Sequence, residues 1–280
     1  MSNSDSIKEM VRTKYSEIAT QSKKENESSC CGGTCSSPEY TIFSEDYSNL
    51  EGYHENANLG LGCGIPTQFA GLRPGLTVLD LGSGAGNDAF VARSIVGERG
   101  KVIGVDMTEA MINKARENSE QLGFNNVEFR LGEIEKLPLT SNSVNVVISN
   151  CVLNLVPDKK KAFSEIFRVL KSDGYFSISD VVLNGSLPEK FKSVAEFYAG
   201  CISGAISKKE YLSIIEDSGF KNIEIKKEKQ IKIPLDILQS YLSPDEIEEY
   251  NNSDLEILSI TVYAEKLEQE DCCSGGTGCC

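Results

Sequence analysis

Histidine and tryptophan are nearly absent from this sequence. Among its 280 residues there is one His, His54, and no Trp. A zinc site built from several imidazoles is therefore excluded, because such sites need two or more His ligands. A His-based acid–base relay is not expected either, since the chain has a single imidazole to offer.

Positive charge and long apolar runs are also scarce. The chain has 28 Lys and Arg against 42 Asp and Glu, a net charge of −14 at pH 7. This surplus of negative charge repels phosphate backbones and anionic lipid, so neither nucleic acid nor a membrane is expected as a partner. No apolar run approaches the roughly 18 residues of a membrane helix, and the first residues lack the apolar segment of a signal peptide. A cytoplasmic location is therefore expected.

Cysteine, by contrast, is abundant, with ten residues. In a reducing compartment, cysteines are expected to bind metals or take part in catalysis rather than to form a disulfide framework. With 40% apolar residues the chain can bury a sizeable core. Its length corresponds to about two units of roughly 150 residues, or to one large domain with an added cap.

Residues 72–184 alternate between β-prone runs and helical periodicity. The β-prone runs are residues 77–81, 101–106, 127–131, 144–149 and 175–181. Helices are expected over residues 87–95, from the capping residue Thr108 to Leu122, and from the capping residue Asp158 to Leu170. This alternation predicts an α/β fold with a parallel sheet, right-handed crossovers and helices on both faces.

Different patterns flank this segment. Before it, an apolar face at helical spacing predicts an N-terminal helix; its members are Ile7, Met10, Val11, Tyr15 and Ile18. After it, helical stretches at 191–200 and 208–218 and β-prone runs at 223–225 and 257–263 predict a smaller C-terminal α+β cap. We therefore divide the chain into an N-terminal helix and cysteine-bearing segment (1–71), a core (72–184), a cap (185–266) and a cysteine-rich tail (267–280) that is expected to be disordered.

A glycine-rich turn follows the first β-prone run. Residues 80–86 read Asp-Leu-Gly-Ser-Gly-Ala-Gly, which lets the backbone approach a ligand closely at a helix N-terminus. The third Gly comes two residues after the second, whereas the dinucleotide fingerprint needs three, so a pyrophosphate is the weaker expectation. Asp106 ends the second run, about 20 residues beyond the turn, where a carboxylate can accept both hydroxyls of a ribose. A plain tight turn is the alternative.

Over residues 72–182 this combination resembles the class I methyltransferases that use S-adenosylmethionine. The resemblance implies a Rossmann-like core in which residues 82–86 surround the methionine part of the cofactor, while Asp106 and Met107 hold the ribose and pack on the adenine. Residues 132–134 would meet the adenine edge, with Glu133 where many relatives have Asp. Asp80 either orients the loop amides or contacts the ligand, and Asn150 would lie beneath the sulfonium. The expected cofactor-binding residues are Asp80, Gly82, Ser83, Gly84, Gly86, Asp106, Met107, Gly132, Glu133, Ile134 and Asn150.

Three isolated cysteines indicate the substrate. Cys151 follows a β-prone run and should stand at the carboxyl end of the fourth strand, beside the crevice where open α/β sheets bind ligands. Cys63 lies in a loop too rich in glycine to be core, and Cys201 lies in the cap. Each alone is more simply a small buried hydrophobe, but together they could converge on one soft, thiophilic atom. Zinc usually takes four ligands, often in close pairs, so a three-coordinate centre with a lone pair fits better.

Three segments around these cysteines resemble the signatures of arsenite methyltransferases, and the likeness extends over about residues 8–234. The segments are residues 62–64 (Gly-Cys-Gly), 149–158 (Ser-Asn-Cys-Val-Leu-Asn-Leu-Val-Pro-Asp) and 200–205 (Gly-Cys-Ile-Ser-Gly-Ala). The resemblance implies that Cys63, Cys151 and Cys201 bind trivalent arsenic. One departure is Leu61, where some eukaryotic members carry a Tyr near the sulfonium.

A further N-terminal cysteine takes part in thiol redox steps in that family. Cys35 matches it best by its distance from Cys63, with Cys30 and Cys31 as alternatives. The resemblance therefore implies methyl transfer to arsenite or its thiol conjugates, with thioredoxin or glutathione as reductant. The alternatives are a class I methyltransferase for another small molecule, and a thiol-rich metal-binding or sensor protein.

Overall fold

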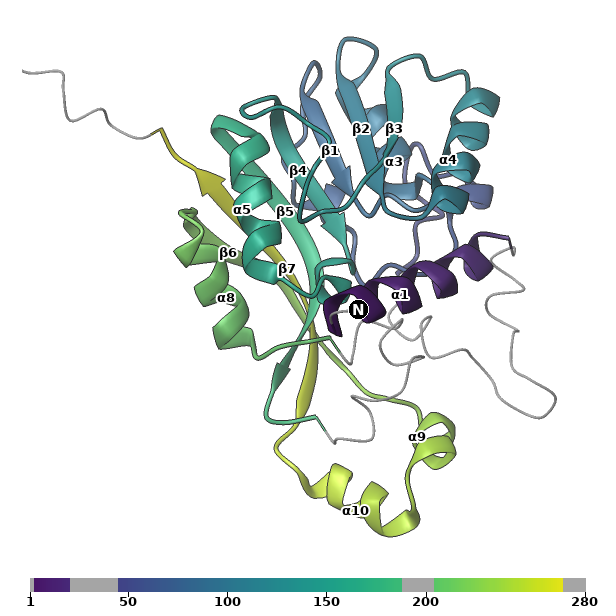
Figure 1. Cartoon of the computed structure of the whole chain (residues 1–280), viewed down its shortest axis with the longest axis vertical. Helices are drawn as coiled ribbons and strands as arrows, with labels where there is room; N and C mark the ends of the chain where they lie inside the picture. Colours follow the sequence, from purple (N-terminus) through teal and green to yellow (C-terminus); the bar gives the residue numbers. More distant parts are fainter. Residues whose placement is uncertain (1–2, 21–44, 188–203, 269–280) are drawn as a thin grey trace, which may run out of the picture.

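The computed structural model describes residues 3–20, 45–187 and 204–268 of the chain (Figure 1). Some expectations fall outside these ranges. They are the helical stretch at 191–200, nearly all of the cysteine-rich tail, and the places of Cys30, Cys31, Cys35 and Cys201. No helix of the described ranges is both long and apolar enough to cross a membrane.

A seven-stranded sheet in the order β3-β2-β1-β4-β5-β7-β6 forms the centre of the molecule. Its first five members run parallel; they are β1 (Thr77–Leu81), β2 (Lys101–Asp106), β3 (Val127–Leu131), β4 (Val144–Asn150) and β5 (Leu170–Asn184). Strand β7 (Glu256–Lys266) pairs antiparallel with β5, and β6 (Lys221–Ile231) pairs antiparallel with β7. The predicted α/β fold class is confirmed.

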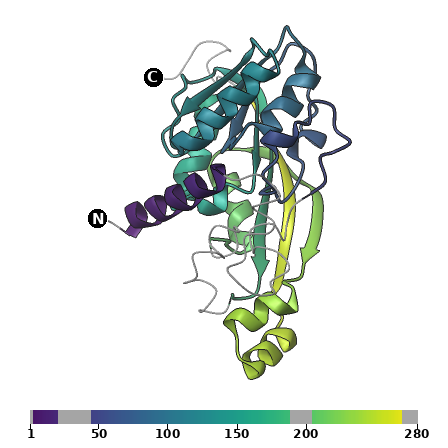
Figure 2. The ribbon, with the colours of Figure 1, turned by 90° about the vertical axis from the view of Figure 1, so that its right-hand side faces the viewer.

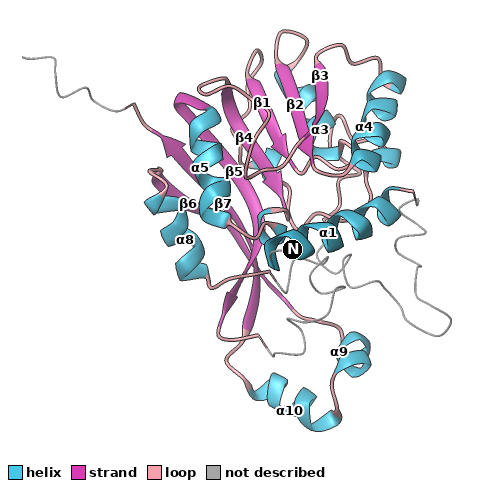
Figure 3. Cartoon of the chain, in the orientation of Figure 1, coloured by secondary structure: helices cyan, strands magenta, loops and turns pink. Residues whose placement is uncertain are grey.

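Both faces of this sheet are covered, because successive side chains of a strand point to opposite faces. Leu79 and Ile103 belong to one apolar cluster, and their neighbours Val78 and Val102 belong to another. Helices α5 (Lys159–Val169) and α8 (Lys208–Asp217) pack on the first cluster, while α3 (Asn87–Val96) and α4 (Glu109–Gln121) pack on the second. Figure 3 shows α5 and α8 in front of the sheet. The predicted helices at 87–95, 108–122, 158–170 and 208–218 all exist.

The C-terminal strands extend the core sheet. Strand β7 pairs with β5 over its full length, from Glu256 opposite Asn184 to Lys266 opposite Gly174. Helices α9 (Leu235–Tyr241) and α10 (Pro244–Asn252) connect β6 to β7 and lie beyond the end of the sheet (Figure 1). The expected cap therefore places its two strands in the same sheet as the core. The four-part division of the chain stays a prediction.

The predicted N-terminal helix is α1 (Asn3–Ala19). Its buried Val11 and Ile18 belong to the apolar face read from the sequence. The helix packs near α4, and Lys114 of α4 donates to the carbonyl of Ala19 at 2.9 Å. It crosses the end of the sheet at which the parallel strands finish, as two perpendicular views show (Figures 1 and 2). This placement makes α1 one wall of the site.

Candidate active site

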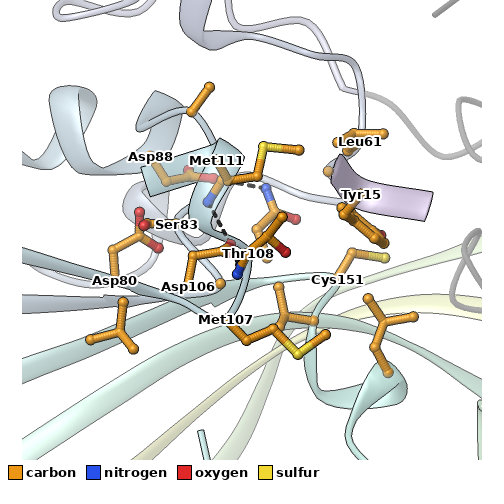
Figure 4. Close-up of a pocket in the computed structure, with 18 of the residues that line it drawn as sticks. Tyr15, Leu61, Asp80, Ser83, Asp88, Asp106, Met107, Thr108, Met111 and Cys151 are labelled. Atoms are coloured by element: carbon orange, nitrogen blue, oxygen red, sulfur yellow. Dashed lines mark hydrogen bonds between the residues drawn. The ribbon is translucent and has the colours of Figure 1, made fainter. Parts of the chain in front are cut away.

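A pocket opens at the carboxyl ends of the parallel strands, where open α/β sheets bind ligands (Figure 4). Its walls come from the loops after β1, β2, β3 and β4, from α1, and from residues 57–62. Ten of the eleven expected cofactor-binding residues line it. The exception is Gly86.

The glycine-rich turn has the conformation that its composition predicts. Gly82, Gly84 and Gly86 have φ values of +62°, +50° and +100°, which residues with a Cβ rarely adopt. Space is restricted as well: a Cβ on Gly82 would lie 2.4 Å from Val152, and one on Gly86 would lie 2.7 Å from the Phe90 ring. The turn therefore follows a path that side chains at these positions would block.

Asp106 fixes this turn to the end of β2. Its Oδ2 accepts a hydrogen bond from the amide of Gly84 at 3.0 Å, and its Oδ1 accepts one from the amide of Thr108 at 2.8 Å. The amide of Met107 and the side chain of Thr108 also hydrogen-bond to this carboxylate. Thr108 occupies the N-cap position of α4, but its side chain makes no capping hydrogen bond, so the capping role expected for it is wrong. Asp158 does cap α5, by accepting from the amide of Lys161.

Three carboxyl groups, those of Asp80, Asp88 and Asp106, line the pocket. Burial raises the pKa of Asp80 well above its ordinary value, and the nearby Asp88 and Asp106 raise it further. Burial also raises the pKa of Asp88, to about 6, and that of Asp106. Because a cation within reach would favour the charged carboxylates, this arrangement suits a positively charged ligand.

Three buried polar atoms at the pocket have no partner within the described ranges. They are Oδ2 of Asp80, Oγ of Ser83 and Oδ1 of Asn87. Buried polar atoms are normally hydrogen-bonded, so unmet atoms beside a pocket point to a ligand that supplies the missing groups. Asp80 also accepts a backbone hydrogen bond from Ala89, which ties it to α3. Its carboxylate can therefore support the helix with one oxygen and face a ligand with the other.

Glu133 is engaged by α1. Its carboxylate accepts from Lys8 Nζ at 2.8 Å and lies 3.6 Å from the Arg12 guanidinium, while Lys8 also pairs with Glu135. Burial lowers the pKa of Lys8, but the two carboxylates outweigh it and the pKa stands above its ordinary value. The loop after β3 is thus held to the N-terminal helix beside the pocket.

Two of the cysteines expected at the substrate site lie in one buried cluster. Cys63 is 1% exposed and Cys151 is 3% exposed, and neither forms a disulfide bond within the described ranges. Cys151 lines the pocket at the end of β4 and has φ +59°, an uncommon conformation for a residue with a Cβ and one found at functional sites. The expectation that the Cys63 loop is outside the core is wrong, because contacts from β4 and β7 bury it.

Several residues that line the pocket were not predicted from the sequence. They are Lys8, Tyr15, Tyr47 and Asp88, which all line the pocket. Tyr15 of α1 lies beside Leu61 (Figure 4). Asp88 carried the one usable signal, an acidic residue in the first turn of the helix after the glycine-rich turn. Tyr47 lies in a loop with no motif of its own.

The strand order, the glycine-rich turn after β1 and the acidic residue ending β2 define a class I methyltransferase fold. Residues 72–219 match a family described as a methyltransferase domain. The chain is 44% identical over 235 residues to an arsenite methyltransferase of Halobacterium salinarum, covering 79% of this chain and 59% of that protein. It is 35% identical to the human arsenite methyltransferase, covering 76% of this chain and 58% of that protein.

Among solved structures, an arsenic (III) S-adenosylmethionine methyltransferase from Chlamydomonas reinhardtii matches with a TM-score of 0.62 and 34% identity, over 75% of this chain and 68% of that one. The chain belongs to the arsenite methyltransferase family. It spans about three fifths of the length of the curated relatives named above.

Proposed function

We propose that this protein transfers a methyl group from S-adenosylmethionine to trivalent arsenic held by the thiols of Cys63, Cys151 and Cys201. One observation carries the proposal: Cys63 and Cys151 share a buried cluster, and Cys151 lines the pocket that the glycine-rich turn and Asp106 also line. A soft thiolate pair in this place suits a thiophilic atom. The third ligand, Cys201, is proposed from the family signature.

The residues at the pocket fit S-adenosylmethionine. Asp106 places carboxylate oxygens at the end of β2 as acceptors for ribose hydroxyls. Oδ2 of Asp80 and Oγ of Ser83 are buried polar atoms without a partner in the described ranges, and the carboxylates of Asp80, Asp88 and Asp106 suit a cation. The remaining proposed contacts are Gly82, Gly84, Gly86, Met107, Gly132, Glu133, Ile134 and Asn150. When bound, the cofactor supplies an electrophilic methyl group on a sulfonium.

Arsenite can be captured without a net change of charge. Each thiol replaces one arsenic-bound hydroxide, so an S–H bond and an As–O bond break, an As–S bond forms and one water leaves. The arsenic keeps its lone pair, which accepts the methyl group, so no general base is needed. The work of the protein is then positioning, which can contribute about 7 to 11 kcal/mol to catalysis.

Accepting a methyl cation raises arsenic formally from the trivalent to the pentavalent state. Two electrons must therefore return before a second methyl can be added. We propose that Cys35 and a thiol donor such as thioredoxin or glutathione supply them, with two thiols oxidised to one disulfide. Cys30 and Cys31 are the alternatives to Cys35.

Incubation of the full chain with arsenite, S-adenosylmethionine and excess thiol should yield methylated arsenicals, resolved by chromatography with arsenic-specific mass detection. Two outcomes contradict the proposal. Arsenite binding with no consumption of S-adenosylmethionine would indicate a sensor. Methylation of a carbon, oxygen or nitrogen acceptor with none of arsenic would indicate a methyltransferase for another small molecule.

The contact of α1 with the loop after β3 gives a second prediction. Lys8→Met should weaken the binding of S-adenosylhomocysteine about two- to fivefold at low salt, the range for a partly exposed ion pair. The effect should fade near 1 M salt, because screening weakens such pairs. Calorimetric titration at both salt concentrations measures it.

Lys14→Met is the matched control for this prediction. Lys14 pairs with Glu17 on the same helix, away from the pocket lining. This variant should bind S-adenosylhomocysteine like the parent chain. Equal low-salt affinities for the two variants would show that α1 does not support the cofactor site through Lys8.

A further inference from the structure

The backbone of Cys63 is held at both of its polar groups. Its N–H donates to Oδ1 of Asn150 at 3.0 Å, and its carbonyl accepts from Oγ of Ser259 at 2.6 Å. Asn150 ends β4, whereas Ser259 stands on β7 and is 6% exposed. The two bonds reach the same residue from two different strands, so the backbone of Cys63 is fixed in position and in rotation.

The glycines beside Cys63 are required by this close approach. A Cβ on Gly62 would lie 2.4 Å from Nδ2 of Asn150, and a Cβ on Gly64 would lie 2.5 Å from Oγ of Ser179. Neither glycine is needed for a positive φ. The Gly-Cys-Gly sequence therefore serves to press the Cys63 backbone against the side chains at the end of the sheet.

The orientation of the Asn150 amide is itself fixed. Its Nδ2 faces three acceptors: Oη of Tyr47 at 2.7 Å, the Gly64 carbonyl at 2.8 Å and Oδ2 of Asp88 at 3.0 Å. The Tyr47 hydroxyl in turn donates toward Oδ1 of Asp88 at 2.8 Å. With Nδ2 turned toward these acceptors, Oδ1 must face the amides of Cys63 and Gly64.

We propose that Ser259 is a positioning residue for the substrate thiol of Cys63, acting together with Asn150. This inference rests on the proposed function, since it assigns the role to a thiol that binds arsenic. A ligand whose backbone is held at N–H and C=O can direct its thiol only along its few side-chain rotamers. Removing an outer-shell partner of a metal ligand typically changes the metal affinity about 10- to 100-fold. The C-terminal strand of the sheet thereby becomes part of the arsenic site.

Ser259→Ala tests the proposal more cleanly than a change at Asn150. Asn150 lines the cofactor pocket, but Ser259 does not. We expect Ser259→Ala to weaken arsenite binding about tenfold or more, read from arsenic–thiolate absorption during titration. The KM for arsenite should rise, while the affinity for S-adenosylhomocysteine and the KM for S-adenosylmethionine stay unchanged.

Ser177→Ala is the matched control. Ser177 on β5 is also a buried serine. Its hydroxyl donates at 2.8 Å to the carbonyl of Pro66, three residues after Cys63. Both variants lose one such bond, so both should melt at a lower temperature by a similar amount. Only Ser259→Ala should lose arsenite affinity. Equal arsenite affinities for the two variants, or a parallel loss of cofactor affinity in Ser259→Ala, would overturn the proposal.

Cys63→Ser separates this inference from the proposed function. Arsenite can also bind the other cysteines. The part of the arsenic–thiolate absorption that is lost in Cys63→Ser is therefore the part that comes from the proposed arsenic site. If Cys63→Ser and the parent chain bind and turn over arsenite equally, the proposed function fails, and the inference fails with it. If Cys63→Ser loses binding but Ser259→Ala does not, the inference alone fails.

Discussion

Replacing Cys151 by serine is expected to lower the rate of arsenite methylation by more than about a hundredfold. Removing a residue that only hydrogen-bonds to a metal ligand typically costs about 10- to 100-fold, and removing the ligand itself should cost more. Serine keeps the Cβ and nearly the volume of cysteine, so the φ of +59° is no more strained than before. The hydrogen bond that the N–H of residue 151 donates to the Ser179 carbonyl, at 2.8 Å, is also retained. What changes is a soft sulfur for a hard oxygen, which arsenic binds far less well under excess thiol.

The rest of the pocket should be unaffected by this change, because the amide of Cys151 bonds to the strand rather than to a ligand. Cys151→Ser should therefore bind S-adenosylhomocysteine as the parent chain does. Cys273→Ser makes the same sulfur-to-oxygen change in the cysteine-rich tail, for which we propose no catalytic role, and it should keep full turnover. Comparable rates for the two variants, measured as methylated arsenic formed under excess thiol, would rule out Cys151 as a ligand.

The fold could be predicted from the sequence because its evidence is local. Each parallel strand is a short β-prone run, and each intervening helix has its own apolar periodicity, so no distant contact is needed to recognise them. The placing of β7 between β5 and β6 is different in kind. Its pairing with β5 depends on residues that are far apart in the sequence. Residues 257–263 predict a strand, but they do not predict which strand pairs with it.

The candidate site shows the same division between local and distant information. Asp106 and Cys151 were predicted at the ends of β2 and β4 because a residue that follows a β-prone run must stand at the edge of the sheet. The burial of Cys63 was not predicted. It depends on Ser259, which lies 196 residues further along the chain and carries no motif. A glycine-rich composition indicates close backbone approach, but it does not say which side chain approaches.

Replacing Asp106 by alanine is expected to weaken the binding of S-adenosylhomocysteine by more than about a hundredfold. Hydrogen bonds to a charged group contribute about 1.5 to 3 kcal/mol each, and the proposed ribose contact uses two of them. The variant also leaves the amides of Gly84 and Thr108 without their acceptor, which loosens the glycine-rich turn. Asp106→Asn keeps one acceptor oxygen. When the parent chain and both variants are titrated with S-adenosylhomocysteine, the affinity of Asp106→Asn should lie between that of the parent chain and that of Asp106→Ala.

Asp158→Ala distinguishes a ligand contact from a general loss of stability. Asp158 is likewise a carboxylate that accepts a backbone amide at the start of a helix, that of Lys161 at 2.9 Å, but it does not line the pocket. Losing this cap should cost about 1 kcal/mol of stability and leave the affinity for S-adenosylhomocysteine unchanged. If Asp106→Ala lowers the affinity no more than Asp158→Ala does, then Asp106 acts only as a support for the turn, and the ribose must be held by other groups.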